Sequence, residues 1–196
     1  AYQRGEAGVY EVPLADDLRA NQRFETPIIT PSTKAAVGEH DEPISRRGLV
    51  EEGYVPQELL DEACDKAMKL FLRGEELAAA QGLILVDTKY EFGMIDGELC
   101  VIDEIHTADS SRYWVADEYE ARFAAGESQR MLDKENIRQW LIGQGYQGEG
   151  TPPEIPSELR VDLAMVYADL HERLLGQGFA AGDVAKPEQL YKVLGV

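Results

Sequence analysis

Two apolar runs joined by Asp96 and Gly97 constrain the fold of this chain more than any other feature. The first run covers residues 83–86 and the second covers residues 99–102. An Asp-Gly pair between two such runs is a strong signal for a tight hairpin turn, because both residues tolerate a positive φ. We therefore expect a single antiparallel β-hairpin over residues 83–105.

Charged side chains follow the first run at every second position. Asp87, Lys89 and Glu91 share one face of an alternating strand, and Ile84 and Val86 lie on the other face, which we expect to be the buried one. Carboxylates at strand ends commonly hold magnesium, and lysine is a common partner of phosphate. The alternative interpretation is a solvated strand face with incidental ion pairs, which add little stability.

The second run ends in Asp103 and Glu104, and their orientation depends on the register of the hairpin. With a tight two-residue turn, Glu91 shares a face with Glu104, and Asp103 points away. With a bulge at Gly97, Glu91 and Asp103 lie on one side. A magnesium site built from Glu91 and Asp103 therefore requires the bulged register, and the sequence leaves both registers open.

A polar loop is expected at residues 109–112, directly after the hairpin. It contains Ser111 and Arg112. The planar fork of an arginine suits a phosphate monoester better than a lysine does. Five carboxylates, one lysine and one arginine would thus gather around one hairpin.

Helices and loops account for the rest of the chain. Pro56 begins the first helix, and Asp133 and Ser157 are candidate N-caps of two later ones. Long loops are expected at residues 28–48 and 143–156. The predicted helices span residues 56–80, 117–125, 133–142, 157–175 and 186–194.

These elements predict an α/β chain of the α+β kind. We expect an antiparallel sheet with packed helices over residues 1–115, which carries the catalytic hairpin. A helical carboxy-terminal portion should follow over residues 116–196.

Composition excludes several classes of function. The chain has 37 acidic and 19 basic residues, a net charge of −18, which argues against nucleic acid and anionic membranes as partners. Only Cys64 and Cys100 are present, so we expect a reducing cytoplasm rather than a disulfide framework. No apolar run approaches the roughly 20 residues of a membrane span, and no signal peptide is visible.

Four segments together resemble the SAICAR synthetase family, whose members are phosphoribosylaminoimidazole-succinocarboxamide synthases. They are ITPSTKAAVGEHDEPIS (29–45), LVDTKYEFG (85–93), IDEIHTADSSRYW (102–114) and DKENIRQWL (133–141). The family's amino-terminal lobe, with its glycine-rich phosphate loop and adenine pocket, has no counterpart here. We therefore expect a fragment of a longer polypeptide, or one half of a split enzyme whose other half is a separate chain.

The resemblance implies a SAICAR synthetase-like, ATP-grasp-like fold and an ATP-dependent ligase. Such an enzyme joins L-aspartate to carboxyaminoimidazole ribonucleotide in purine biosynthesis, by way of an acyl phosphate. Within the matching motifs, Glu91 and Asp103 correspond to ligands of magnesium and the ATP phosphates. Lys89 corresponds to the lysine beside the reacting groups, and Asp87 to the acid near the imidazole substrate.

The same resemblance implies a set of substrate contacts. Arg112 and Ser111 match the ribonucleotide-phosphate site. A substrate-side loop is matched by Ser32, Lys34, His40 and Asp41. From the residues alone, an ordinary exposed loop histidine is the favoured interpretation of His40, and only the resemblance puts a substrate contact on an equal footing.

Two other functions stay open at this stage. One is a different ATP-dependent carboxylate–amine ligase, which the match over residues 31–45 disfavours. The other is a non-catalytic remnant that binds a nucleotide or serves as an assembly partner, which the missing lobe makes a serious alternative.

Overall fold

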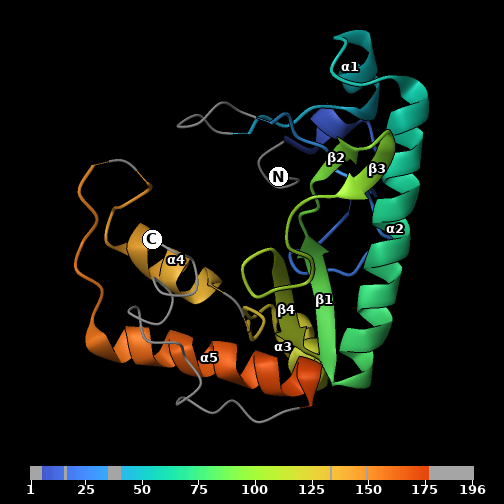
Figure 1. Cartoon of the computed structure of the whole chain (residues 1–196). Helices are drawn as coiled ribbons and strands as arrows, with labels where there is room; N and C mark the ends of the chain where they lie inside the picture. Colours follow the sequence, from blue (N-terminus) through green and yellow to red (C-terminus); the bar gives the residue numbers. More distant parts are fainter. Residues whose placement is uncertain (1–5, 16, 35–40, 133, 149, 177–196) are drawn as a thin grey trace.

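The structure, a computed structural model, describes residues 6–15, 17–34, 41–132, 134–148 and 150–176. A long helix, α2 (Gln57–Ala80), runs along one side of the molecule, as Figure 1 shows. Its buried positions are Leu60, Cys64, Gly74 and Ala78, an apolar stripe at helical spacing. The helix begins one residue after Pro56, which is its N-cap, and ends before Gly82 at φ 68°.

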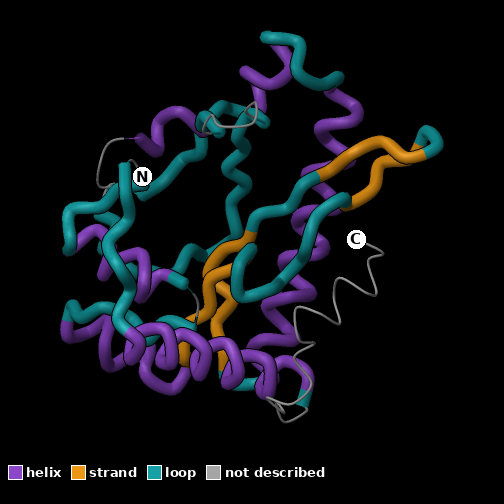
Figure 2. Tube along the Cα trace, turned by 60° about the vertical axis from the view of Figure 1, so that its left-hand side comes forward, coloured by secondary structure: helices purple, strands orange, loops and turns teal. Residues whose placement is uncertain are grey.

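The residues predicted as one hairpin form two separate strand pairs. β1 (Leu83–Thr88) pairs antiparallel with β4 (Ser111–Val115), while β2 (Phe92–Ile95) pairs antiparallel with β3 (Glu98–Val101). Figure 2 shows the two pairs as distinct orange segments, with the β2–β3 hairpin projecting outward. The prediction of one continuous hairpin is therefore wrong. The prediction of a polar loop at 109–112 is wrong for Ser111 and Arg112, which lie in β4.

The turn between β2 and β3 is the tight one. Asp96 and Gly97 have φ of 52° and 86°, and Ile95 pairs directly with Glu98. The bulge at Gly97 that the magnesium argument required is absent. The last hydrogen bond of this pair runs from Ile102 N to Glu91 O at 3.0 Å.

A register shift occurs instead within β1. Leu85 pairs with Tyr113 and Asp87 pairs with Arg112, so one extra residue, Val86, is accommodated on β1. Because of this shift, Leu85 lies on the face of the buried Tyr113, whereas Asp87 lies on the face of the exposed Arg112. The shift lets one short strand carry a core side and a charged side.

The hydrophobic core lies on the inner face of the β1–β4 pair. Leu83 and Leu85 are 1% and 2% exposed, whereas Ile84 and Val86 are only half-buried, so the face predicted to be buried is the wrong one. The buried members of the core, which come from α2, both strands and later segments, are Ala78, Leu83, Leu85, Tyr113, Val115, Leu132 and Leu170.

In the part of the chain that the structure describes, three helices follow β4. They are α3 (Ala116–Ala125), α4 (Glu135–Gly143) and α5 (Ser157–Leu175), and α5 crosses the lower end of the molecule in Figure 1. Pro156, not Ser157, is the N-cap of α5. The predicted cap Asp133 and the predicted helix at 186–194 lie outside the described residues.

The amino-terminal third is mostly irregular. It contains the 3₁₀ helix η2 (Glu6–Tyr10) and the short helix α1 (Arg46–Glu51), which the sequence argument missed. Ser45 caps α1 by accepting a hydrogen bond from Gly48 N at 2.9 Å, so the predicted loop at 28–48 ends earlier than expected. Across the described part of the chain, no helix is both long and apolar enough to cross a membrane.

Candidate functional site

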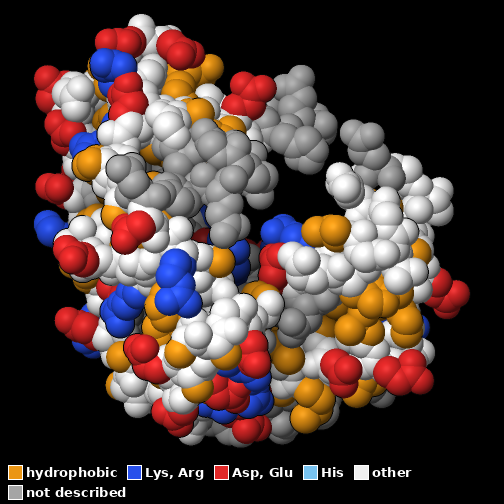
Figure 3. Space-filling view, turned by 180° about the vertical axis from the view of Figure 1, so that it is seen from behind, with side chains coloured by type: hydrophobic (Ala, Val, Ile, Leu, Met, Phe, Trp, Pro, Cys, Tyr) orange, Lys and Arg blue, Asp and Glu red, His pale blue; other side chains and the backbone are white. Residues whose placement is uncertain are grey.

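A cavity of about 1080 Å³ lies between α2, β1 and the extended segment of residues 22–34. Its floor is apolar and comes largely from α2. One end is charged and contains Lys34, Asp41, Asp87, Lys89 and Glu91. Figure 3 shows the molecule from behind, where a deep hollow separates the part with α2 from the part with α4 and α5.

The centre of the charged end is Glu91. Lys34 Nζ donates to both of its carboxylate oxygens, at 2.8 and 2.7 Å, and Lys89 Nζ lies 3.0 Å from Glu91 Oε1. Lys89 also donates to Asp41 Oδ2 at 2.9 Å. Two cations and two carboxylates thus alternate around a single point, although they come from segments more than 45 positions apart in sequence.

The protonation states of this cluster follow from its hydrogen bonds. The hydrogen bond from Lys34 is the largest cause that holds the pKa of Glu91 below its usual value, and the hydrogen bond from Lys89 is the next largest. The hydrogen bond from Lys89 to Asp41 is the largest cause that raises the pKa of Lys89, followed by its hydrogen bond to Glu91. At neutral pH, Lys89 is therefore a fixed cation, which suits a group that offsets phosphoryl charge and not a general base.

Residues 31–34 and 41–44, here called the arm, pair with each other and place Lys34 and Asp41 at the cluster. Thr33 N donates to Glu42 O at 2.9 Å, and Ser32 and Pro43 form an isolated antiparallel bridge. Ser32 and Lys34 both line the cavity. His40, which the resemblance places among the substrate contacts, lies outside the described residues.

Arg112 and Asp87 form the second charged pair, across the β1–β4 register. Arg112 Nε donates to Asp87 Oδ1 at 2.9 Å, and its Nη2 contacts Asp87 Oδ2, so the guanidinium engages the carboxylate with two nitrogens. Asp87 lines the cavity. Both side chains are about half exposed, which leaves the arginine accessible to a ligand.

Ser111 is buried and fixes the strand pair beneath Arg112. Its Oγ donates to Thr88 Oγ1 at 2.8 Å, and its N donates to Thr107 O at 3.0 Å. With 3% of its surface exposed, Ser111 is placed for support of the site rather than for direct contact with a ligand. Ser110 and Thr107 continue the network.

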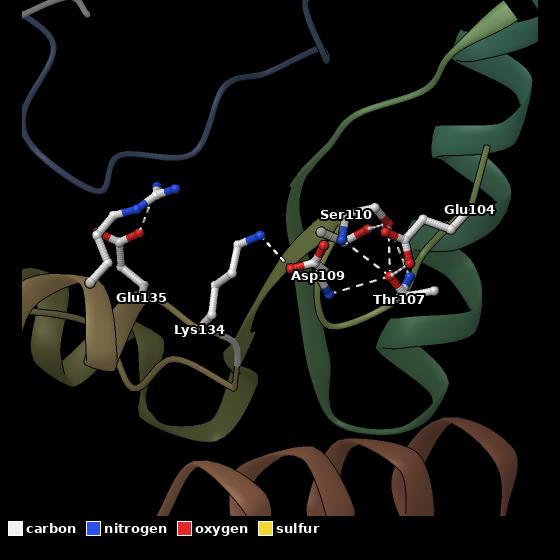
Figure 4. A network of polar contacts seen from close by, with 8 residues as sticks. Glu104, Thr107, Asp109, Ser110, Lys134 and Glu135 are labelled. Atoms are coloured by element: carbon white, nitrogen blue, oxygen red, sulfur yellow. Dashed lines mark hydrogen bonds and ion pairs between the residues drawn. The ribbon is translucent and has the colours of Figure 1, made fainter. Parts of the chain in front are cut away.

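Figure 4 shows that network around the loop before β4. Thr107 Oγ1 donates to Glu104 Oε2 at 2.6 Å and accepts from Ser110 N at 3.1 Å. Lys134 reaches across from the start of α4 and contacts Asp109. The loop is thus stabilised both internally and by the later helical segment.

Asp103 does not join the charged end of the cavity. It is exposed, does not line the cavity, and its Oδ1 accepts from Glu104 N at 2.9 Å. Regular pairing stops at Val101, so strand alternation no longer determines where Asp103 points. The register argument for a Glu91–Asp103 pair therefore has no support from the strand geometry, and the pair remains an expectation from the resemblance.

Sequence reasoning missed a contact behind the cluster, between Tyr90 and His106. Tyr90 Oη lies 2.6 Å from His106 Nε2, and His106 O accepts from Tyr113 Oη at 2.8 Å. The His106 ring packs against Gly74 of α2 so closely that a Cβ on Gly74 would be 2.4 Å from His106 Cε1. Burial lowers the pKa of His106. Burial is also the largest of the causes that raise the pKa of Tyr90 to about 12.

The sequence carried no usable signal for this junction. His106 has φ 58°, a conformation that non-glycine residues rarely adopt, and Tyr90 stands between two charged residues. Neither property is visible as a pairing in sequence, because the loop that brings His106 back to the strand has no periodic pattern.

Comparison with known proteins identifies the family to which the chain belongs. The SAICAR synthetase family model matches residues 2–153. The phosphoribosylaminoimidazole-succinocarboxamide synthase of Cytophaga hutchinsonii is 44% identical over 190 residues, which cover 96% of this chain and 61% of that protein. The chain spans about three fifths of the length of the curated relatives it matches.

Solved structures agree with the sequence comparison. The SAICAR synthase of Saccharomyces cerevisiae, in complex with SAICAR, has a TM-score of 0.74 at 31% identity and covers 91% of this chain and 56% of that one. A type-2 SAICAR synthetase in complex with ADP has a TM-score of 0.57 at 25% identity and covers 80% of this chain and 54% of that one. The predicted fold class is confirmed.

Proposed function

Since the chain belongs to the SAICAR synthetase family, we propose that it is part of the ATP-dependent ligase that joins L-aspartate to carboxyaminoimidazole ribonucleotide. The observation that carries the proposal is the alternating cluster of Lys34, Glu91, Lys89 and Asp41 at one end of a large cavity. Phosphoryl transfer needs little covalent help from a protein and much fixed charge, which this cluster supplies.

The proposed reaction has two steps, phosphorylation of the carboxylate and attack by the amine. An oxygen of the imidazole carboxylate attacks the γ-phosphorus of ATP, the bond to ADP breaks, and an acyl phosphate forms. The amine of aspartate then attacks the acyl carbon, phosphate leaves, and the amine loses a proton. Among relatives, one solved structure contains SAICAR and another contains ADP, which supports small-molecule substrates of these kinds.

We propose a role for each side chain from the resemblance together with its surroundings. Lys89 stays protonated and offsets charge on the transferred phosphoryl group. Arg112 holds the phosphate of the ribonucleotide. Asp87 orients Arg112 before the ligand binds, and it lies beside the imidazole of the bound substrate. Ser111 supports this pair from below. The substrate-side contacts come from Ser32, Lys34 and Asp41, with His40 added on the resemblance alone.

A magnesium ion is also proposed, with Glu91 and Asp103 as its protein ligands. Mg²⁺ is usually held by one or two carboxylates together with phosphate oxygens, and when bound it neutralises developing phosphate charge. Glu91 is one candidate ligand, since it lines the cavity, and a metal ion would replace the lysines that its carboxylate oxygens now contact. Asp103 is the second ligand that the resemblance implies. Within the described ranges, no three His, Cys, Asp or Glu side chains converge on one point, so the residues described supply at most part of a metal site.

The alternative is a non-catalytic half that binds nucleotide or assembles with a partner. It is favoured by one observation, the restriction of the match to about three fifths of the relatives' length. For either function we propose a cytoplasmic location, consistent with the free thiols of Cys64 and Cys100.

Coupled measurement of ADP release tests the proposal. The chain is assayed with ATP, L-aspartate and carboxyaminoimidazole ribonucleotide, alone and together with the part of the Cytophaga relative that it does not span. We expect turnover that depends on both other substrates, and a loss of about 10²–10³-fold for Lys89→Ala. The matched control is Lys69→Ala, an exposed lysine of α2 outside the cavity. No turnover in the reconstituted mixture would defeat the ligase in favour of the non-catalytic half.

A further inference from the structure

Among the residues that the structure describes, none pairs with one edge of β1, whereas both edges of β4 are covered. β4 pairs with β1 on one side, and on the other side Val115 N donates to Arg130 O at 3.1 Å and Leu132 N donates to Tyr113 O at 2.9 Å. Across the described ranges, β4 is the sole strand partner of β1. The second row of β1 backbone groups therefore faces away from the sheet.

The composition of β1 is that of an inner strand. Residues 83–86 are Leu-Ile-Leu-Val, a continuous apolar run, which is typical of strands buried on both faces. Natural edge strands are usually protected by lysine, proline or a covering element, and this run has neither residue. The register shift after Leu85 bends the strand only at its far end, beside the charged cluster.

The open edge faces the large cavity. Every residue from 84 to 92 lines it, and because alternate side chains point to opposite faces, a cavity that touches all of them lies along the strand edge. The apolar end of the cavity also exposes two large side chains, Phe24 at 39% and Leu72 at 45%. An edge rich in backbone donors and acceptors thus lies beside uncovered apolar surface.

We propose that this slot receives an extended apolar segment, which pairs with the free edge of β1 and comes from the part of the family's chain that residues 1–196 do not span. About two fifths of the length of these relatives is not matched here, which is enough chain to supply it. A second copy of this chain is disfavoured as the occupant, because each copy carries a net charge of −18. The proposal rests on family membership and on this edge, not on the ligase activity.

Hydrogen–deuterium exchange in a reconstituted complex tests it. The full chain is coexpressed with the unspanned part of the Cytophaga hutchinsonii relative, and the stoichiometry is measured by sedimentation. We expect a one-to-one complex in which the backbone amides of residues 83–88 exchange at least tenfold more slowly than in the chain alone. No ATP or substrate is present, so the result is independent of catalysis.

A pair of variants on α2 makes the test specific. Leu72→Lys places a charge in the slot, whereas Leu77→Lys places one at a position of similar exposure, 49%, outside the cavity. Leu72→Lys should weaken the complex at least tenfold and Leu77→Lys should leave its affinity unchanged. Phe24→Lys is a second slot variant, from a different segment, with the same expected effect.

Three results would overturn the proposal. They are the absence of a complex, a complex with unchanged exchange at residues 83–88, and a homodimer of this chain that protects these amides. A complex that forms as expected yet releases no ADP would contradict the proposed ligase and leave the docking site intact.

Discussion

Lys34 Nζ lies 2.7 Å from Glu91 Oε2, which fastens the arm, residues 31–34 and 41–44, to the segment that follows β1. The side chain of the lysine is 72% exposed and that of the glutamate 17%, so an exposed cation is held by a largely covered carboxylate. A ligand phosphate entering the cavity would compete with Glu91 for the same ammonium group. The ion pair thus links the position of the arm to the charge at the site.

Removal of this lysine should be visible as a change in the pKa of Glu91. In Lys34→Ala, we expect the pKa of the Glu91 carboxyl to rise toward 4.5, because its largest depressing contact is lost. A carboxyl carbon NMR titration measures it. Because the native pKa is depressed, the contribution of Glu91 to stability is present above pH 4.5 and is lost as pH falls through the native value. An unchanged titration would show that the contact is absent in solution.

Arg112→Lys should weaken binding of the ribonucleotide. A lysine cannot offer two parallel donors to a phosphate, so we expect at least a tenfold loss of affinity, about 1.4 kcal/mol. Calorimetry with carboxyaminoimidazole ribonucleotide on the reconstituted pair measures it, and ATP affinity is the internal control. Equal affinity of variant and parent for the ribonucleotide would remove Arg112 from the phosphate site.

The buried His106 predicts a pH dependence of stability. Its native pKa is lowered, so the unfolded state binds a proton first, and stability should fall as pH drops below 6.5 toward the native pKa. In His106→Asn, which suits φ 58°, urea midpoints should change less between pH 6.5 and 5 than in the parent. Glu91 titrates below this window. Parallel pH profiles for the two proteins would contradict the assignment.

Gly74 should be intolerant of any side chain. A Cβ there would lie 2.4 Å from His106 Cε1 and 2.8 Å from Leu85 Cδ2, so Gly74→Ala should destabilise the fold by about 1–3 kcal/mol. The matched control is Gly143→Ala at the end of α4, where a Cβ meets nothing within 4 Å. That change should be neutral or stabilise by about 0.4–1 kcal/mol. Denaturant unfolding separates the two, and similar effects would argue against the packing of His106 on α2.

The sequence predicted the long elements and the turn well. α2 was expected at 56–80 and lies at Gln57–Ala80, because its apolar stripe and terminal signals are local. The two-residue turn at Asp96 and Gly97 was one of the registers considered, and it is the observed one. The division of the chain after residue 115 stays a prediction.

Long-range pairing was where sequence reasoning failed. The partner of β1 is β4, whose Ser111 and Arg112 look like loop residues because they are polar and follow a run of turn formers. The register shift at Val86 leaves no trace in the hydrophobic pattern, so the buried face was assigned to Ile84 instead of Leu85. Lys34 and Asp41 were included only through the resemblance, since no local pattern connects them to Lys89.

The extra residue at Val86 has a consequence for how this strand tolerates change in length. Deletion of that single position would leave Leu85, Asp87 and Thr88 opposite Tyr113, Arg112 and Ser111 in a regular ladder, and would remove only the local twist that the extra residue adds. Shortening or lengthening the Gly97 turn would also leave the orientations of Asp87 and Thr88 unchanged. Natural variants that lack a residue at Val86 should therefore keep the Asp87–Arg112 pair and differ in the twist of β1 beside the cavity.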